Sequence, residues 1–176
     1  FDRVLYTLRL LRRPVIAAVH GMAYGGGCEI AISTDFIIAA DDARFGQPEA
    51  MVGLSAGGGS PVFLPRVLPP GLALQMLMTG QPITAQEAYR RGMVNEVHPR
   101  AELMKAVLRI AEQIASNSPT AVQAVKRAVL MGEGEPIEQG GVGRPGPLSA
   151  EVVHRFHDAL AVVEGPEAID EDSRRQ

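Results

Sequence analysis

The stretch HGMAYGGGCEIAIS, residues 20–33, decides the fold, because three consecutive glycines run directly into a cysteine, a glutamate and an apolar segment. The apolar run VIAAV at 15–19 precedes it and predicts a buried strand. The run FIIAA at 36–40 predicts a second buried strand, and CEIAIST predicts the start of a helix between them. A strand, a glycine turn, a helix and a strand in this order predict an α/β crossover unit.

The glycine triplet predicts a pocket for negative charge. Glycines at a strand-to-helix turn adopt backbone angles that other residues resist, and they let a ligand approach the main chain closely. The helix that follows presents unpaired N–H groups and the positive end of its dipole. Phosphate is one candidate ligand, but the sequence lacks the Lys-Ser/Thr of a P-loop and the GxGxxG spacing. The other candidate is an enolate or thioester oxyanion.

Two carboxylates frame this segment. Glu29 follows the glycines inside the first helical turn, and Glu49 lies in the turn-rich stretch RFGQPEA at 44–50. Two carboxylates beside an oxyanion pocket can divide the acid and base roles if their surroundings separate their pKa values. Each also has an ordinary explanation, because the helix dipole alone favours a glutamate in a first turn and Glu49 alone is a common loop residue. The residues by themselves support the enzymatic and the structural interpretations equally.

Composition narrows the class of protein. The chain has 176 residues, 46% of them hydrophobic, which suits one globular domain with a sizeable core. A net charge of −3, no Trp, three Tyr and five Phe disfavour a nucleic-acid surface. The single cysteine, Cys28, excludes an intrachain disulfide and fits a reducing compartment. No apolar run approaches the roughly 20 residues of a membrane helix. We therefore expect a cytoplasmic protein that binds neither nucleic acid nor a membrane.

Histidine and cysteine spacing gives no metal site. His20 and Cys28 lack ligand spacing, and His154 and His157 lie three apart on a predicted helix without other ligands. We therefore expect no bound metal and interpret the last two as surface histidines.

Patterns along the chain predict its organisation. The finer elements expected are a helix at 1–12, a turn from His20 to Gly27, a turn-rich connection at 41–50 and a strand at 93–97. The last helix is predicted from one apolar face, made by Val152, Val153, Phe156, Leu160 and Val163. The regions expected are an α/β core at 1–98, a helical region at 99–132, a flexible Gly/Pro linker at 133–149, and a C-terminal helix and tail at 150–176.

Several motifs resemble the enoyl-CoA hydratase/isomerase (crotonase) family. They are RPVIAAVHGMAYGGGCEIAISTDFIIAADDARFGQPEAMVGL, GGGS, LPRVL, LMTGQPITAQEAYRRGMVNEVHP and IASNSPTAVQAVKRAV. The similarity runs from Arg13 to about Leu130, about two thirds of the chain. It implies an α/β fold, a crotonase-like spiral of ββα units with a C-terminal helical region, assembled as a homotrimer or a hexamer.

The resemblance also implies residue roles. Gly26, the middle glycine of the triplet, would donate one oxyanion-hole N–H to the thioester carbonyl of an acyl-CoA substrate. Glu29 would activate water for attack on Cβ, and Glu49 would deliver a proton to Cα. Having both carboxylates favours enoyl-CoA hydratase over the alternatives, a double-bond isomerase or a non-catalytic crotonase-like subunit. No separate cofactor is expected, since coenzyme A is part of the substrate.

The chain also departs from the family pattern. The resemblance places Tyr24, Gly25, Ala56 and Gly57 at the substrate pocket, with Ala56 where many relatives have proline. The family's first oxyanion-hole amide and most CoA contacts lie in an N-terminal part that this sequence does not contain. We therefore expect the chain alone to be weakly active or inactive. The ending VEGPEAIDEDSRRQ matches the family poorly.

Overall fold

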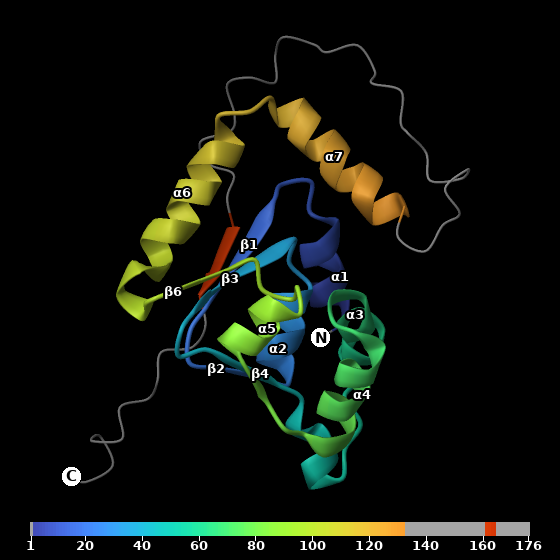
Figure 1. The fold of residues 1–176 in the computed structure, drawn as a ribbon. Helices are drawn as coiled ribbons and strands as arrows, with labels where there is room; N and C mark the ends of the chain where they lie inside the picture. The colour runs from blue at the N-terminus through green and yellow to red at the C-terminus, as the bar shows by residue number, and fades with distance from the viewer. Residues whose placement is uncertain (1, 133–160, 165–176) are drawn as a thin grey trace, which may run out of the picture.

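Two small sheets organise the computed structural model, which describes residues 2–132 and 161–164 (Figure 1). The first sheet is parallel throughout, with the strand order β6-β3-β1-β7. In the second, β2 pairs with β4 in parallel and β4 pairs with β5 in antiparallel orientation. The strands are β1 (Val15–Val19), β2 (Met22–Tyr24), β3 (Phe36–Ala40), β4 (Arg44–Gly46), β5 (Ile83–Thr84), β6 (Glu96–His98) and β7 (Ala161–Glu164).

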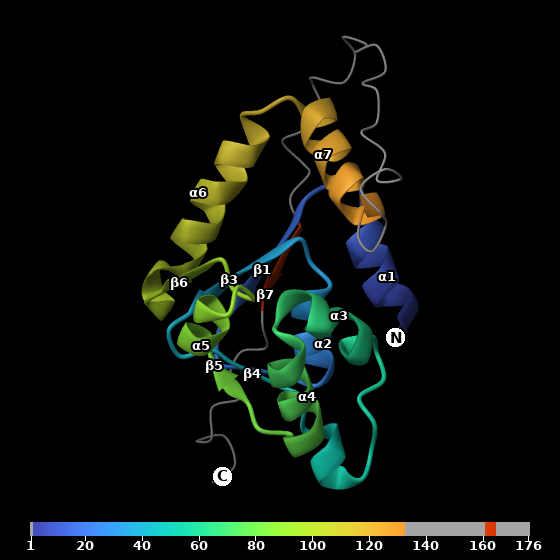
Figure 2. The same ribbon diagram turned by 45° about the vertical axis from the view of Figure 1, so that its right-hand side comes forward.

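Helices pack on both faces of the first sheet (Figures 1 and 2). In the described residues, the α-helices are α1 (Asp2–Leu10), α2 (Gly26–Ile32), α3 (Ser60–Val67), α4 (Pro70–Thr79), α5 (Ala85–Arg90), α6 (Leu103–Ala115) and α7 (Pro119–Gly132). Two short 3-10 helices, η1 (Pro48–Val52) and η2 (Arg100–Glu102), lie in the connections. None of the helices in these ranges is long and apolar enough to cross a membrane.

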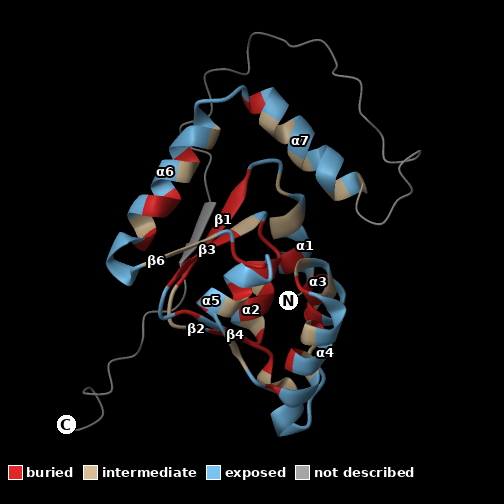
Figure 3. Cartoon of the chain, viewed as in Figure 1, coloured by how far each residue is buried: buried red, intermediate tan, exposed pale blue. Residues whose placement is uncertain are grey.

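The central strands β1 and β3 are buried on both faces, which explains why they are continuous apolar runs. Alternate side chains of β1 pack into two different hydrophobic cores. Ala17 and Val19 belong to the larger core, which also contains residues of α2, α3, α4 and α5. Ile16 and Ala18 belong to a second core against α6. The buried residues that α6 contributes are Leu103, Ala106, Val107 and Ala111 (Figure 3).

The predicted crossover unit is confirmed, with β1 and β3 at the predicted positions 15–19 and 36–40 and α2 between them. The expected turn from His20 to Gly27 is wrong in part, because it contains β2. The expected connection at 41–50 likewise contains β4 and the start of η1. Both strands are three residues long, too short to show periodicity, and they form by pairing with each other, as Tyr24 with Gly46.

The strand predicted at 93–97 lies further along the chain, as β6. Gly92, with φ 87°, ends the α5 segment, and the N–H groups of Met93 and Val94 then donate to Ala88 O. Met93 and Val94 are buried in the larger core rather than in the sheet. Pairing with β3 begins only where Asn95 N–H donates to Ile37 O at 2.8 Å and Ile37 N–H donates to the Asn95 side chain at 3.0 Å.

The predicted C-terminal helix is wrong at Val163, which lies in β7 and pairs with Ala17 of β1. A neighbouring strand edge is a non-local partner that the helical pattern does not reveal. Residues 150–160 and 165–176 of the predicted helix and tail, with His154 and His157 among them, and the predicted linker at 133–149 lie outside the described residues.

Candidate active site

The glycine turn between β2 and α2 has the geometry that requires glycine. Gly25 has φ 51° and ψ −121°, a conformation that residues with a Cβ rarely adopt. Its N–H donates to Gly46 O at 2.9 Å, which fixes the turn to the end of β4. Gly26 is the first residue of α2, so its N–H lacks an acceptor within the helix. The turn therefore offers a backbone donor at a helix start.

Glu29 is held inside the protein by α2. Its N–H donates to Gly25 O at 2.9 Å, closing the first helical turn, and its residue surface is only 4% exposed. Its carboxylate Oε1 accepts a hydrogen bond from Ser60 Oγ at 3.1 Å. The backbone of α2 and the Ser60 hydroxyl thus fix the position of this carboxylate.

Glu49 reaches the same turn from η1. A Cβ placed on Gly25 would lie 2.8 Å from Glu49 Oε1, so the carboxylate rests directly on the Gly25 backbone. Glu49 is half-buried, and its carbonyl accepts from Leu54 N–H at 2.9 Å. The structure thus brings the two predicted carboxylates to one glycine turn, Glu29 from inside the helix and Glu49 from across it.

Two residues that the sequence analysis missed connect these carboxylates. The side chains of Gln47 and Ser60 are fully buried, and the Gln47 amide lies 2.6 Å from Ser60 Oγ. In the amide orientation that pairs every group, Gln47 Nε2 donates to Glu49 Oε2 and Oε1 at 3.2 and 3.3 Å, and Gln47 Oε1 accepts from Ser60 Oγ. A signal for Gln47 existed, since it stands two residues before Glu49 in the same motif, but nothing near Ser60 in sequence points to the site.

Cys28 lies between the same groups but is not equipped as a nucleophile. Burial raises the pKa of its thiol to about 12, against hydrogen bonds from the Gln47 side chain and the Gly46 backbone, and the charges of Glu29 and Glu49 raise it further. A reactive cysteine needs a lowered pKa and access, so this thiol stays neutral and packs as a core residue.

The residues predicted for the substrate pocket come from two segments, the glycine turn and the loop before α3. Gly25 is buried in it, and the Tyr24 ring packs over Gly46, with Cδ1 3.3 Å from where a Cβ of Gly46 would lie. Ala56 is half-buried and Gly57 exposed in the loop that leads to α3. Tyr24 and Gly25 thus lie at the turn itself, whereas Ala56 and Gly57 belong to the loop before α3.

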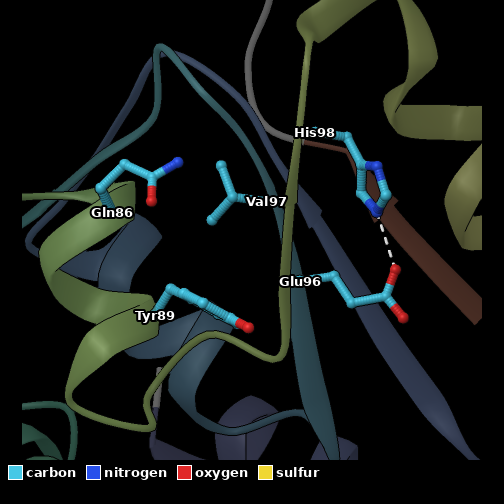
Figure 4. Close-up of a pocket in the computed structure, with 5 residues that line it drawn as sticks. All are labelled: Gln86, Tyr89, Glu96, Val97 and His98. Carbon is cyan, nitrogen blue, oxygen red and sulfur yellow. Dashed lines mark hydrogen bonds and ion pairs between the residues drawn. The ribbon is translucent and has the colours of Figure 1, made fainter.

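A separate pocket of about 310 Å³ contains none of these residues. Gln86 and Tyr89 of α5 and Glu96, Val97 and His98 of β6 line it (Figure 4). Glu96 accepts from His98 Nε2 at 2.7 Å and from Arg109 at 2.8 Å. These hydrogen bonds hold the pKa of Glu96 below its ordinary value despite some burial. Glu96 in this pocket is thus paired with His98 and Arg109, which is typical of a structural ion-pair network.

The described residues, 2–132 and 161–164, contain no group of three or more His, Cys, Asp or Glu side chains arranged to hold a metal ion. His20 is half-buried at the end of β1, and Cys28 is enclosed in α2. Histidines 154 and 157 lie beyond these ranges.

The chain is similar to known proteins in both sequence and fold. The family model described as enoyl-CoA hydratase/isomerase matches residues 1–138. The short-chain-enoyl-CoA hydratase of Clostridium acetobutylicum is 48% identical over 131 residues, covering 74% of this chain and 50% of that protein. The carnitinyl-CoA dehydratase of Salmonella typhimurium is 41% identical over 164 residues, covering 92% of this chain and 61% of that protein.

A solved structure, the enoyl-CoA hydratase of Bacillus anthracis, superposes with a TM-score of 0.77 at 38% identity. The superposition covers 79% of this chain and 54% of that one. The predicted fold class is thereby confirmed. The chain spans only about half to three fifths of the length of the relatives that it matches.

Proposed function

Since this chain belongs to the enoyl-CoA hydratase/isomerase family, we propose that it carries out enoyl-CoA hydratase chemistry. The reaction is the reversible addition of water to a 2-enoyl-CoA thioester, giving a 3-hydroxyacyl-CoA. One observation carries the proposal: Glu29 and Glu49 converge on the glycine turn that begins α2. The names of the two relatives, a hydratase and a dehydratase, both describe water added or removed at a CoA thioester.

The site residues divide the work of hydration. The N–H of Gly26 donates to the thioester oxygen as that oxygen gains negative charge. Glu29 takes a proton from water while the water oxygen bonds to Cβ, and protonated Glu49 gives its proton to Cα. The pair ends with Glu29 protonated and Glu49 ionised, so the substrate has gained one water and no proton is lost. Tyr24, Gly25, Ala56 and Gly57 would flank the acyl group.

The test is hydration of a short 2-enoyl-CoA, followed as loss of the conjugated-thioester absorbance. Glu29→Gln and Glu49→Gln should each lower kcat by about 10²–10⁴-fold, the usual contribution of a general acid or base. Both variants should keep the wild-type circular dichroism spectrum. The intact mass of the sample is checked alongside, because the chain spans about half of its relatives. Full hydration by both variants would refute the proposal.

A second candidate is a non-catalytic subunit of the same family. Acyl-CoA binding without turnover would support that role, and turnover by the isolated chain would exclude it. A double-bond isomerase is the third candidate, because the family model covers both activities. Product analysis separates it, since isomerisation shifts an alkene and hydration forms a 3-hydroxyacyl thioester.

We further propose a cytoplasmic homotrimer or hexamer that uses acyl-CoA as substrate and needs no cofactor of its own. Support for assembly comes from α7, on which Val125 and Val129, one turn apart, are each more than 60% exposed. Exposed apolar residues on one face of a helix are typical of an interface between subunits. Light scattering coupled to size-exclusion chromatography gives the mass in solution, and a monomer across the accessible concentrations would contradict the assembly.

A further inference from the structure

The tripeptide Gly-Gln-Pro occurs twice in the sequence, at 46–48 directly before Glu49 and at 80–82 directly before β5. The strands beside the two copies, β4 and β5, pair in antiparallel orientation, with Phe45 opposite Ile83. Continued past the strands, this register sets the first glycine against the second proline and the second glycine against the first proline. We call the two facing tripeptides the Gly-Gln-Pro clasp.

The atomic contacts have this reciprocal arrangement. A Cβ on Gly46 would lie 3.1 Å from Pro82 Cβ and 3.3 Å from Pro82 Cα, and a Cβ on Gly80 would lie 3.3 Å from Pro48 Cα. Carbon atoms pack at about 3.5–4.0 Å, so neither glycine leaves room for a side chain. Both glycines are buried. Since a proline has no N–H with which to continue a ladder, close packing of each glycine against the opposite proline extends the strand pair.

The half of the clasp at 80–82 is held by α4 and β5. Gly80 N–H donates to Met76 O at 2.9 Å and has φ 69°, so it ends α4 in the left-handed conformation. Gln81 N–H donates to Thr79 Oγ1 at 3.2 Å, which ties the next residue to the same helix. β5 follows directly and pairs with β4. This half is therefore fixed at both ends, by a helix and by a sheet.

The half at 46–48 runs into η1, which carries Glu49 but buries none of its residues. Burial of its own side chains therefore does not hold η1 in place. Instead, α4 ends beside η1 (Figures 1 and 2), and Met51 lies across the Gly80 backbone, where a Cβ would come within 2.5 Å of Met51 Cγ. The fixed half of the clasp thus supports the segment that carries the carboxylate.

We propose that the Gly-Gln-Pro clasp positions Glu49 at the glycine turn. Gly46 and Gly80 are its positioning residues, because each admits the opposite proline to close packing. Gly46 also sets the turn itself, since its carbonyl accepts from Gly25 N–H at 2.9 Å. Glu49 Oε1 then rests on the Gly25 backbone, 2.8 Å from where a Cβ would lie. The catalytic meaning rests on the hydratase function proposed above, in which Glu49 works at this turn.

The first test measures the approach of Glu49 to Gly25 by NMR, without turnover. Glu49→Gln changes the carboxylate that rests on Gly25, so it should shift the Gly25 amide signal of the 15N-labelled protein. In the Gly46→Ala and Gly80→Ala backgrounds, the shift that Glu49→Gln causes should fall to less than half. No shift in the wild type, or an equal shift in all three backgrounds, would overturn the proposal.

The second test is hydration of a short 2-enoyl-CoA by the folded variants. A misplacement of about 1 Å costs roughly 10²-fold in rate. In Gly46→Ala the clasp has to open by only about 0.4 Å to reach normal carbon spacing, so kcat should fall by about 10-fold and KM should change less. A merely structural role would lower the free energy of unfolding and leave the kcat of the folded protein unchanged.

Gly92→Ala separates the clasp from backbone strain. Gly92 has φ 87° and ends the α5 segment, so it matches the conformation of Gly80, but a Cβ there would meet nothing within 4 Å. This variant should leave the NMR shift and kcat at their wild-type values. If Gly80→Ala does not fold, Gly46→Ala gives the same test without a positive φ.

A size swap shows which neighbour of Gly46 matters, because its Cβ would also lie 3.3 Å from Tyr24 Cδ1. Pro82→Gly adds no atoms and creates no clash, yet it should weaken the NMR shift as Gly46→Ala does. The double variant moves the side chain to the other half of the clasp and should restore the shift. Restoration by Tyr24→Ala and not by Pro82→Gly would overturn the proposal.

The NMR test needs no turnover, so the two proposals fail separately. A shift that depends on the clasp in a protein that does not hydrate enoyl-CoA would refute the hydratase function and keep the clasp. Hydration in a protein whose NMR shift is equal in all backgrounds would refute the clasp and keep the function.

Discussion

Of the helices α2 and α7, the shorter one, α2, is the more deeply buried. The seven-residue α2 buries Cys28, Glu29, Ala31 and Ile32, whereas the fourteen-residue α7 buries only Pro119. Figure 3 shows α7 exposed along most of its length, while α2 is enclosed by neighbouring elements. The burial of a helix thus depends on the elements packed around it and not on its length. Short helices in particular need such tertiary contacts, because they are marginally stable alone. The site is built on the enclosed helix.

The largest difference is expected from truncating one apolar side chain on each helix. Ile32 of α2 is 2% exposed, so Ile32→Ala should lower the free energy of unfolding by about 2–5 kcal/mol. Val125 of α7 is 64% exposed within one chain, so Val125→Ala should change the free energy of unfolding of the monomer by no more than about 0.5 kcal/mol. Urea denaturation measures both, at a protein concentration low enough to keep the chain monomeric. A cost for Val125→Ala that matches Ile32→Ala in the monomer would contradict this difference between the two helices, whereas a cost that appears only at higher concentrations would support the assembly proposed above.

The next effect comes from the turn that starts α2. Gly25→Ala forces a Cβ into a positive-φ conformation and to within 2.8 Å of Glu49 Oε1. We expect a loss of about 1–3 kcal/mol in unfolding free energy from the backbone alone. A carboxylate displaced by about 1 Å should also lower hydration by roughly 10²-fold.

The matched control for this change is Gly27→Ala, two residues further along. A Cβ at Gly27 meets nothing within 4 Å and the residue lies in the helix. This variant should be neutral or more stable by up to about 1 kcal/mol, since alanine favours a helix over glycine. Equal effects of the two substitutions would show that the close approach of Glu49 to Gly25 is unimportant.

A smaller effect is expected where α7 joins the rest of the molecule. Lys126 Nζ donates to Asp35 Oδ2 at 2.7 Å and to Arg13 O at 2.9 Å. Lys126→Met should cost about 1 kcal/mol, the upper end for such a pair outside a core. Hydrogen exchange should accelerate in α7 amides and stay unchanged in α2. Faster exchange in both helices would show that α7 supports the site.

The difference between these regions also explains what the sequence could predict. The strands at 15–19 and 36–40 were predicted correctly because burial on both faces makes them continuous apolar runs. Helix α7 falls within the helical region predicted at 99–132, but the sequence did not show that Val125 and Val129 on its apolar face are exposed in the described chain. Gln47 and Ser60 were missed because Ser60 lies 31 residues from Glu29 and 13 from Gln47. Hydrogen bonds between such distant residues follow no periodic pattern.

The smallest expected effect is the pH dependence that Cys28 of α2, the single cysteine of the chain, gives to the free energy of unfolding. Burial raises the pKa of its thiol from 9.0 to about 12. The folded protein therefore holds this proton more tightly than the unfolded chain does. The resulting stability is fully present below pH 9 and is lost as the pH rises from about 9 towards 12, with a slope of up to about 1.4 kcal/mol per pH unit.

Cys28→Ala isolates this contribution, because other alkaline groups titrate equally in both proteins. The difference in unfolding free energy between wild type and Cys28→Ala should be constant from pH 6 to 8 and should fall above pH 9. Val125→Ala, on α7, should follow the wild-type curve throughout. Parallel curves for wild type and Cys28→Ala up to pH 11 would mean that the thiol gains access to water in the folded state. The packing of α2 around the two glutamates would then be looser than that of the strands beside it.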